Sequence, residues 1–510
     1  MNPMDAAKLA AETLAAFKSA QATPSALLKS TFSQPTSATS GINYYDLELG
    51  AKMIYPVLTP LRNEIPRVSG KGGIQANWRA ITAINPGQIS AGVSGGNRGA
   101  VIAVTTTDYI AAYRGLGLEA NVDFEADYAA EGFDDAKALA TRTLLESLMI
   151  QEEITILGGD GAAVALGTCQ TPTLAGSTTG GTLAAQTWSV IAYALTLEGV
   201  MNASLSGGIL GLVTRTNADQ SQDTFGGGSS ARSAAATATT TGATSSIAVT
   251  IAPVNGALGY ALFWGTAGNE TLGAIINLNS YVITAAATGT QLSSAVPNGA
   301  ADNSLNALKF DGLLYQAFKS GSNAYIATQP TGTAGTGTPL TPDGEGGVVE
   351  IENALKHFWD VYRLSPTKIY VSSQEQKNIN KCVLQGSQTN AQRFVFNVDQ
   401  AKVAGGTMVR SYLNKYSMNG AIEIPIEIHP NMPPGTILLY TNKLPYPMSN
   451  VGNVVQIRAR REYYQIEWPL VSRKYQYGVY CDEVLQNYAP FSLGIITNIA
   501  NGVGTASLTA

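Results

Sequence analysis

The chain has 510 residues and a formal net charge of −5, and only 13% of its residues are charged. This length exceeds one ordinary hydrophobic core, so two to three domains are expected. The acidic balance argues against a protein that condenses nucleic acid by itself. Low charge combined with 53 glycines favours extended strands and subunit contacts over the surface of a freely soluble enzyme.

The sequence carries no sign of export or of a membrane span. Charged residues interrupt the N-terminal segment, which is therefore not a signal peptide: Lys8, Glu12 and Lys18. The uncharged stretch after Glu483 contains Asn487 and Pro490, so it is not expected to cross a membrane. Three widely spaced cysteines lack metal-type spacing and are expected to be reduced thiols: Cys169, Cys382 and Cys481. We expect an intracellular protein, or one that leaves a cell by lysis.

The first part of the chain suggests arms and loops. Residues 1–43 contain a short amphipathic helix and a Ser/Thr/Pro-rich stretch, which together predict a flexible arm or a mobile terminus. Residues 44–66 are expected to be extended, because prolines block a long helix. Residues 67–118 contain two alternating runs around a Gly-rich tip, which predicts a long β-hairpin. The hairpin has few core-sized residues and is expected to lie on another subunit.

A long helix is predicted over residues 131–157, within a domain spanning 119–170. Its apolar residues recur at spacings of three and four: Phe133, Ala136, Ala140, Leu144 and Leu148. Acidic residues stand at its positive end, Glu131, Asp134 and Asp135, and Gly158-Gly159 ends it. Glu152 and Glu153 lie near the end where the helix dipole disfavours acids. We expect cations from the closing strands or a neighbouring subunit to meet them.

The composition changes after this helix. Residues 171–301 contain short strand-like runs without a helix, which predicts an inserted β-sandwich. The run NGALGYALFWGT resembles the central strand of fibronectin type III or immunoglobulin-like modules. Residues 302–492 return to mixed helices and strands, with Val349, Leu355, Phe358 and Val361 as buried candidates of one helix. Residues 493–510 are interpreted as a C-terminal tail.

No catalytic, cofactor-binding or metal-binding constellation is expected. His357 and His429 are the only histidines, and nothing in the sequence brings either of them to Cys382 as a thiol nucleophile would require. The loop with Asp343 and Glu345 has too few ligands for calcium. The glycines at 158–161 follow a helix rather than a strand, which excludes a phosphate cradle of the usual kind.

One basic cluster interleaves with aromatic residues near the C-terminus: Arg458, Arg460, Arg461, Arg473 and Lys474. These residue types can pair with phosphates and stack on bases. Strand-face ion pairs are the favoured alternative, because the chain is acidic overall. Arg458 and Arg460 share a strand face and are expected to meet acidic residues of the helix at 131–157 or of a neighbour.

The order of these parts resembles the major capsid protein of tailed bacteriophages, which has the Hong Kong ninety-seven fold. The resemblance covers most of the chain and includes FDGLL, PTKIYVSS, IPIEIHPNMPPGTILLYT and QIRARREYYQIEW. It implies an α+β fold with an N-arm, an extended hairpin loop, a peripheral domain built on a spine helix, and an axial domain. The segment after residue 302 would form the axial domain and the closing strands of the peripheral one.

The resemblance also implies a function. Many copies would assemble as pentamers and hexamers into an icosahedral head in the bacterial host cytoplasm, with double-stranded DNA contacted weakly on the inner face. Portal, decoration and scaffolding proteins would be further partners, and the virion would be the final location. The candidates for contacts between subunits are charged residues: Arg98, Glu131, Asp134, Asp135, Glu152, Glu153, Arg458, Arg460 and Arg461.

The chain departs from the family pattern in two places, and two other functions stay open. Only about forty residues precede Tyr44, so cleavage of a scaffolding segment is an open question, and Lys71 stands at the hairpin base rather than its tip, so covalent crosslinking is not predicted. An encapsulin-type compartment would use the same fold. A tail protein or adhesin built from immunoglobulin modules would explain residues 171–300 but not the helices.

Overall fold

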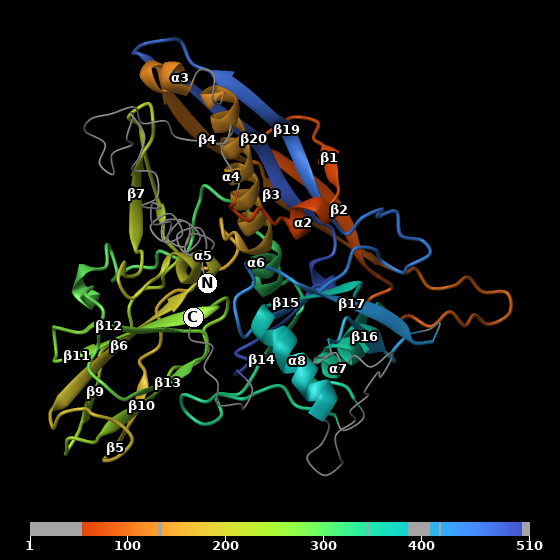
Figure 1. Ribbon diagram of the computed structural model, residues 1–510. Coiled ribbons are helices and arrows are strands. Elements are labelled where there is room, and N and C mark those ends of the chain that lie inside the picture. Colours follow the sequence, from red (N-terminus) through yellow and green to blue (C-terminus); the bar gives the residue numbers. More distant parts are fainter. Residues whose placement is uncertain (1–53, 131–134, 344–345, 386–407, 418–419, 502–510) are drawn as a thin grey trace, which may run out of the picture.

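The structure, a computed structural model, describes residues 54–130, 135–343, 346–385, 408–417, 420–501 (Figure 1). The predicted helix in residues 3–20 and most of the predicted arms lie outside these ranges. None of the helices in the described part of the chain combines the length and apolarity that a membrane crossing requires. The predicted α+β class is confirmed by the mixture of helices and sheets.

A four-stranded sheet and one long helix form the first body. The strand order is β1-β19-β20-β4, with bounds Arg67–Ser69, Val455–Glu467, Lys474–Asn487 and Arg114–Asp123. The helix α4 (Ala136–Gly158) lies along this sheet in Figure 1, after the short helix α3 (Phe124–Ala130). Leu144 and Leu148 of α4 pack against Val122, Val479 and Cys481 of the sheet, with Ala136 and Ala140 beside them, so the predicted apolar stripe is confirmed from Ala136 onward. Phe133, also predicted for the stripe, lies outside the described residues.

Local chemistry explains both ends of α4. Asp135 accepts hydrogen bonds from the backbone N–H groups of Lys137 and Ala138, which makes it the N-cap. The helix ends at Gly158, and a Cβ at Gly159 would lie 2.4 Å from the carbonyl oxygen of Phe310. The chain therefore needs glycine where it leaves the helix. Glu131 and Asp134, predicted for the first turn, lie outside the described residues.

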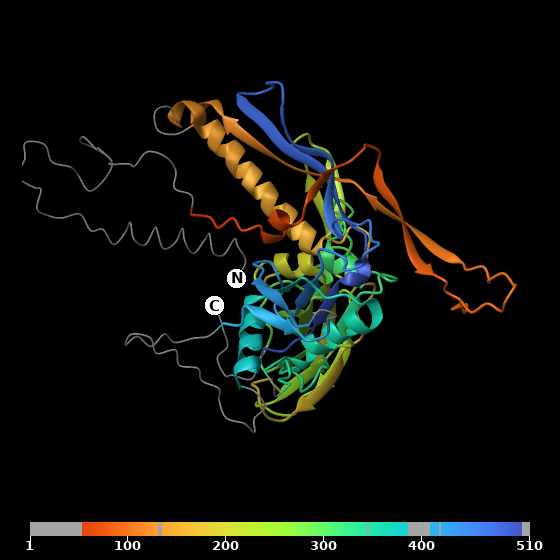
Figure 2. The ribbon, with the colours of Figure 1, turned by 90° about the vertical axis from the view of Figure 1, so that its right-hand side faces the viewer.

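The predicted hairpin is present but shorter than residues 67–118. Its strands are β2 (Gln75–Ile84) and β3 (Val104–Ala112), which pair only with each other in the described structure. The flanking strands β1 and β4 belong instead to the four-stranded sheet. Figure 2 shows the hairpin projecting away from the rest of the chain.

Residues 173–283 form two sheets that share a core. The three-stranded sheet has the order β13-β10-β5, with bounds Ser280–Ile283, Ser246–Thr250 and Thr173–Ser177. The four-stranded sheet has the order β12-β11-β6-β9, with bounds Thr271–Ile276, Gly259–Gly265, Thr187–Leu195 and Ala236–Thr239. Ile247 and Val249 of one sheet pack with Val190 and Leu262 of the other.

The four-stranded sheet is covered on both faces, unlike a simple two-layer sandwich. Tyr193 and Phe263 point to the second face, where they pack with Ile209 and Val296. This region also contains a small hairpin and two short helices that were not predicted: β7 (Leu212–Thr216), β8 (Gln222–Gly226), α5 (Leu197–Asn202) and η2 (Ser293–Ala295). Coverage on both faces explains why β6 is buried almost throughout rather than on alternate residues.

A six-stranded sheet forms the last body. Its order is β14-β21-β18-β15-β17-β16, with bounds Tyr325–Thr328, Gly494–Thr497, Ile437–Tyr440, Lys368–Val371, Ile422–Ile428 and Ser411–Asn414. Its helices are α6 (Leu313–Phe318), α7 (Val349–His357), the π-helical turn η3 (Phe358–Tyr362), α8 (Ser373–Gln385) and η4 (Pro490–Ser492).

Two expectations about this last body are wrong. The predicted tail at 493–510 contains β21, which is fully buried between β14 and β18. Val361 is 55% exposed rather than buried, because the helix changes to a π turn at Phe358 and its register shifts. Leu355 and Phe358 are buried as predicted.

The largest apolar cluster joins these bodies at the C-terminal end of α4. Leu61 of helix α2 (Pro60–Glu64), Ile156 and Leu157 of α4, Phe310, and Leu438 of the six-stranded sheet all belong to it. Each of these side chains is at most 2% exposed. The arm, the sheet of β1, β19, β20 and β4, and the six-stranded sheet therefore meet at the last turns of α4.

Candidate functional site

Glu153 binds the arm to α4. Its Oε1 accepts a hydrogen bond from the backbone N–H of Leu61 at 2.9 Å, and its Oε2 accepts one from Arg62 at 2.7 Å. These N–H groups belong to the first turn of α2, where no intrahelical acceptor is available. The carboxylate therefore supplies the acceptors that this helix lacks.

His429 is the third partner of Glu153. Its Nε2 lies 2.6 Å from Oε1 of Glu153, and both side chains are fully buried. The Nδ1 of the same ring accepts a hydrogen bond from the backbone N–H of Asn431. Because Nδ1 is the acceptor, the proton of a neutral ring stands on Nε2 and is donated to Glu153.

Glu152 gathers a second set of partners beside the first. Nε of Arg62 donates to its Oε2 at 2.9 Å, and both Arg67 of β1 and the hydroxyl of Tyr463 of β19 are bonded to it directly. The guanidinium carbons of Arg62 and Arg67 lie 5.3 and 5.2 Å from the centre of the Tyr463 ring. A fully buried carboxylate is tolerable only with such compensation.

Arg67 connects this cluster to a third carboxylate. Its Nη1 donates to Oε2 of Glu483 at 3.0 Å, while Nη2 binds Glu152. Burial, followed by repulsion from Glu152, raises the pKa of Glu483 to about 8. Burial therefore favours the protonated form of Glu483. The arm is held by a compact network of two arginines and three acids, which we call the arm junction: Arg62, Arg67, Glu152, Glu153 and Glu483, with Tyr463 and His429.

The arm junction corrects the predicted partners of the long helix. Cations do meet Glu152 and the histidine ring meets Glu153, but the cations come from α2 and β1 rather than from the closing strands or a neighbour. Both carboxylates are 0% exposed within the chain itself. The sequence did contain a signal for these partners: Arg62 and Arg67 are the only basic residues of the described arm and β1.

The prediction that Arg458 and Arg460 meet acids of the long helix is also wrong within the chain. Arg460 pairs with Asp482 of the adjacent strand at 3.0 Å, and Arg458 lies 3.5 Å from the side-chain oxygen of Gln486. The guanidinium carbon of Arg461 stands 3.8 Å from the centre of the Tyr464 ring. The Arg460 pair is a strand-face ion pair of the kind favoured from the sequence.

The other predicted residues lie apart from the arm junction. Arg98 is exposed near the hairpin tip, and Asp135 caps the far end of α4. Cys169, Cys382 and Cys481 are buried free thiols, and burial raises the pKa of Cys382 to about 11. In the described ranges, no three His, Cys, Asp or Glu side chains are placed to hold a metal ion.

The hairpin presents a second functional surface. Its large apolar side chains are exposed on both strands, with Ile81 at 65%, Ile84 at 68% and Ile110 at 66%. Only its base is anchored, where Trp78 stacks on Tyr109 and contacts the edge of the Tyr488 ring. A ribbon of two strands with an exposed apolar surface is marginal in water unless it lies on something else.

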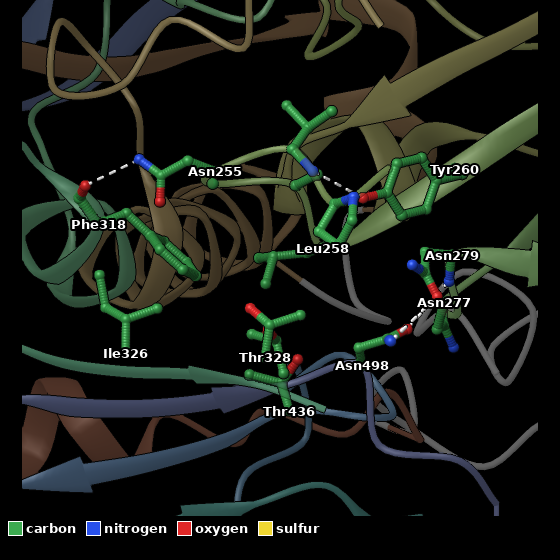
Figure 3. Close-up of a pocket in the computed structure, with 15 residues that line it drawn as sticks. Asn255, Leu258, Tyr260, Asn277, Asn279, Phe318, Ile326, Thr328, Thr436 and Asn498 are labelled. Carbon is green, nitrogen blue, oxygen red and sulfur yellow. Dashed lines mark hydrogen bonds between the residues drawn. The ribbon is translucent and has the colours of Figure 1, made fainter. Parts of the chain in front are cut away.

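A cavity of about 200 Å³ lies between the two-sheet region and the six-stranded sheet (Figure 3). Four asparagines contribute to its mainly apolar and hydroxyl lining, Asn255, Asn277, Asn279 and Asn498, and three of them are hydrogen-bonded within the chain. Asn279 and Asn498 exchange two hydrogen bonds of 3.0 Å each, and Asn255 donates to the carbonyl oxygen of Phe318. These bonds join the two regions and leave few groups for a ligand.

The arm junction predicts a pH-dependent stability. An acid whose pKa rises from 4.5 to about 8 on folding contributes stability that is full below pH 4.5 and is lost as the pH rises to 8. Glu483→Gln removes this pH dependence. We therefore expect the free energy of unfolding of the variant, relative to that of the wild type, to rise between these pH values, by about 1–3 kcal/mol at pH 8.5. Urea unfolding of both proteins at pH 5 and pH 8.5 measures this difference in the free energy of unfolding. An equal difference at both pH values would contradict the protonated state of Glu483.

Neither a family model nor a curated protein matches the chain. Several solved structures do. The capsid of the native GTA particle matches at 7% identity and a TM-score of 0.39, covering 90% of this chain and 96% of its own. The capsid of Myoviridae phage XM1 matches at 8% and 0.38, covering 90% and 97%. The SrpI encapsulin of Synechococcus elongatus PCC 7942 matches at 9% and 0.34, covering 90% and 96%. Because these identities and TM-scores are low, the function is inferred from the chain's own geometry.

Proposed function

We propose that this chain is the major capsid protein of a tailed bacteriophage, with a structural rather than an enzymatic role. Many copies form the pentamers and hexamers of an icosahedral head that encloses double-stranded DNA. The observation that carries this proposal is the hairpin of β2 and β3, a long ribbon whose exposed apolar side chains have no core in the described chain. Such a ribbon is stabilised when it lies across a second copy.

The sequence of parts supports the Hong Kong ninety-seven fold. In chain order there is an arm, a projecting hairpin, the long helix α4 on its sheet, and the six-stranded sheet, with β19 and β20 returning to the sheet of α4. We assign the sheet of β1, β19, β20 and β4 to the peripheral domain and the six-stranded sheet to the axial domain. Residues 171–301 are assigned to an inserted immunoglobulin-like sandwich, with the extra layer over its four-stranded sheet as an elaboration.

The mechanism is geometric. The arm junction fixes the arm to the C-terminal end of α4, so a force on the arm is transmitted to the spine of the peripheral domain. Each subunit then buries a modest area at several edges, and the shell becomes stable because these contacts repeat and close. A tightly bound arm on a stiff helix keeps the subunit's shape while the contacts between subunits form.

The wider partners follow from this role. Portal, scaffolding and decoration proteins would bind the shell, and the shell would assemble in the bacterial host cytoplasm and persist in the virion. Contacts with DNA on the inner face would be weak, because the net charge of the chain is −5.

Expression of the full chain tests the proposal. We expect closed shells in negative-stain micrographs and a fast-sedimenting species in velocity centrifugation. Monomers or solitary rods alone would contradict the capsid role and favour a tail protein or adhesin. The contents of native particles separate the remaining alternative, because DNA supports a phage head and a protein cargo indicates an encapsulin-type compartment.

A further inference from the structure

A second cavity, of about 320 Å³, lies at the base of the hairpin. Its walls come from the hairpin, from β20 and from the chain around α6, and its apolar lining includes Trp78, Ile110, Phe310 and Leu485. Because the hairpin forms one wall, the cavity is continuous with the surface proposed to contact a neighbouring copy.

Three lining residues have a buried polar atom that no described residue satisfies: Trp78 Nε1, Gln316 Oε1 and Asn487 Nδ2. The orientation of both amides is set by their other atoms. Gln316 donates through Nε2 to the carbonyl oxygens of Asp311 and Leu485, and Asn487 accepts through Oδ1 from the N–H of Ala489. The remaining atoms are two donors and one acceptor, which is the complement of a peptide group. A buried polar atom that stays unpaired destabilises the folded chain.

The charges at this cavity are mainly positive. Arg114, Lys309 and Lys319 line it, and Asp311 is the only acid among the lining residues. The Asp311 carboxylate accepts hydrogen bonds from the N–H groups of Gly161 and Ala162, and Lys309 pairs with Glu198 at 3.1 Å. Arg114 and Lys319 are joined to no described carboxylate by an ion pair, so they remain available to an acidic ligand.

We propose that this cavity is a socket for residues 42–50 of a neighbouring copy of the chain. This segment, INYYDLELG, combines two tyrosines with Asp46 and Glu48, which complement the aromatic wall and the cations of the socket. One of its peptide groups would satisfy the unpaired donors and acceptor. The inference rests on the proposed assembly of identical chains, and it names which part of one copy engages which part of the next.

The position of the arm favours a second copy over the chain's own segment. The described chain begins at Ile54. In Figure 2 the red stretch that leads into α2 approaches α4 from the side away from the hairpin. The described end of the arm therefore lies on the side of α4 away from the socket, which favours a socket on another copy for the residues that precede it. A neighbour related by the symmetry of a shell would offer its socket to these residues.

Crosslinking tests the socket in the full chain. We expect two co-expressed variants, Glu48→Cys and Lys319→Cys, to give a covalent dimer with a short bifunctional maleimide, because the native cysteines are buried. The matched control replaces Lys319→Cys by Lys356→Cys, an exposed lysine on α7, and should give no dimer. Shells without the dimer overturn the socket, as does a crosslink formed only within one chain carrying both substitutions.

A peptide titration separates the socket from shell formation. We expect a synthetic peptide of residues 42–50 to bind the unassembled full chain and to change its tryptophan fluorescence. The change should disappear in Trp78→Phe, and a peptide with Asp46→Asn and Glu48→Gln should bind at least tenfold more weakly. Binding without shells would contradict the capsid role alone. Equal binding of both peptides, or none, would overturn the socket even if shells form.

Discussion

Glu153→Ala is expected to lower the free energy of unfolding by about 3–5 kcal/mol, the largest effect of any single substitution at the arm junction. The variant leaves the N–H groups of Leu61 and Arg62 and the buried ring of His429 without their acceptor. It also leaves a cavity beside the largest apolar cluster, to which Leu61 belongs. Chemical denaturation measures the loss, and limited proteolysis near Leu58 detects release of the arm.

Glu153→Gln provides an intermediate if the alanine variant does not fold. The amide retains one acceptor but places a donor where the carboxylate accepted, so part of the loss is expected. Glu146→Ala is the matched control on the same helix, because the Glu146 side chain is 22% exposed and its ion pair in the described structure is an exposed one with Arg142. The loss of unfolding free energy caused by Glu146→Ala should stay below about 0.5 kcal/mol. If Glu153→Ala lowers the free energy of unfolding by no more than this control, the arm is not held by the Glu153 carboxylate.

Replacing two paired hairpin residues, Ile84→Thr and Val104→Thr, is expected to prevent shell formation while leaving the subunit stable. The two residues face each other across the hairpin and are 68% and 52% exposed, so they contribute little to the core of their own chain. Threonine is β-branched and keeps the strand preference. Burial of such apolar side chains on a neighbour contributes about 1.5–3 kcal/mol each, repeated at every subunit contact.

For this hairpin variant, sedimentation measures the fraction of the protein in shells, and thermal unfolding measures the stability of the subunit. The shell fraction should fall at least tenfold, with the midpoint of unfolding of the subunit unchanged. Leu205→Thr, an exposed residue of the two-sheet region at 42%, is the control and should assemble normally. Normal shells from the double variant would remove the hairpin as the main contact and with it the observation on which the proposed function rests.

Much of the architecture could be predicted from local patterns. The stripe that includes Leu144 and Leu148 predicted α4, and Gly158-Gly159 predicted its end to within a residue. The Gly-rich tip between two alternating runs predicted the hairpin. These features depend on residues that are close in sequence, where the periods of helix and strand and the conformations of glycine act directly.

The arm junction could not be predicted in the same way. Glu152 and Glu153 indicated by their position that cations were needed, but not which ones. The partners are Arg67, which lies 85 residues away in sequence, and His429, which lies 276 away. Nothing in the period of a helix encodes such a choice. Arg458 and Arg460 fitted the sequence argument equally well, and only the packing of β1 beside the last turns of α4 excluded them.

The C-terminal strand shows the same division. The run Gly494–Thr497 is short, uncharged and followed by glycines, and by itself it is indistinguishable from a tail. It becomes a strand because β14 and β18 leave a place between them where its backbone groups are paired on both sides. The sequence determined the long helix α4, the hairpin and the need for compensated charge. The tertiary structure decided which distant segments met, because pairing and burial depend on distance in space rather than in sequence.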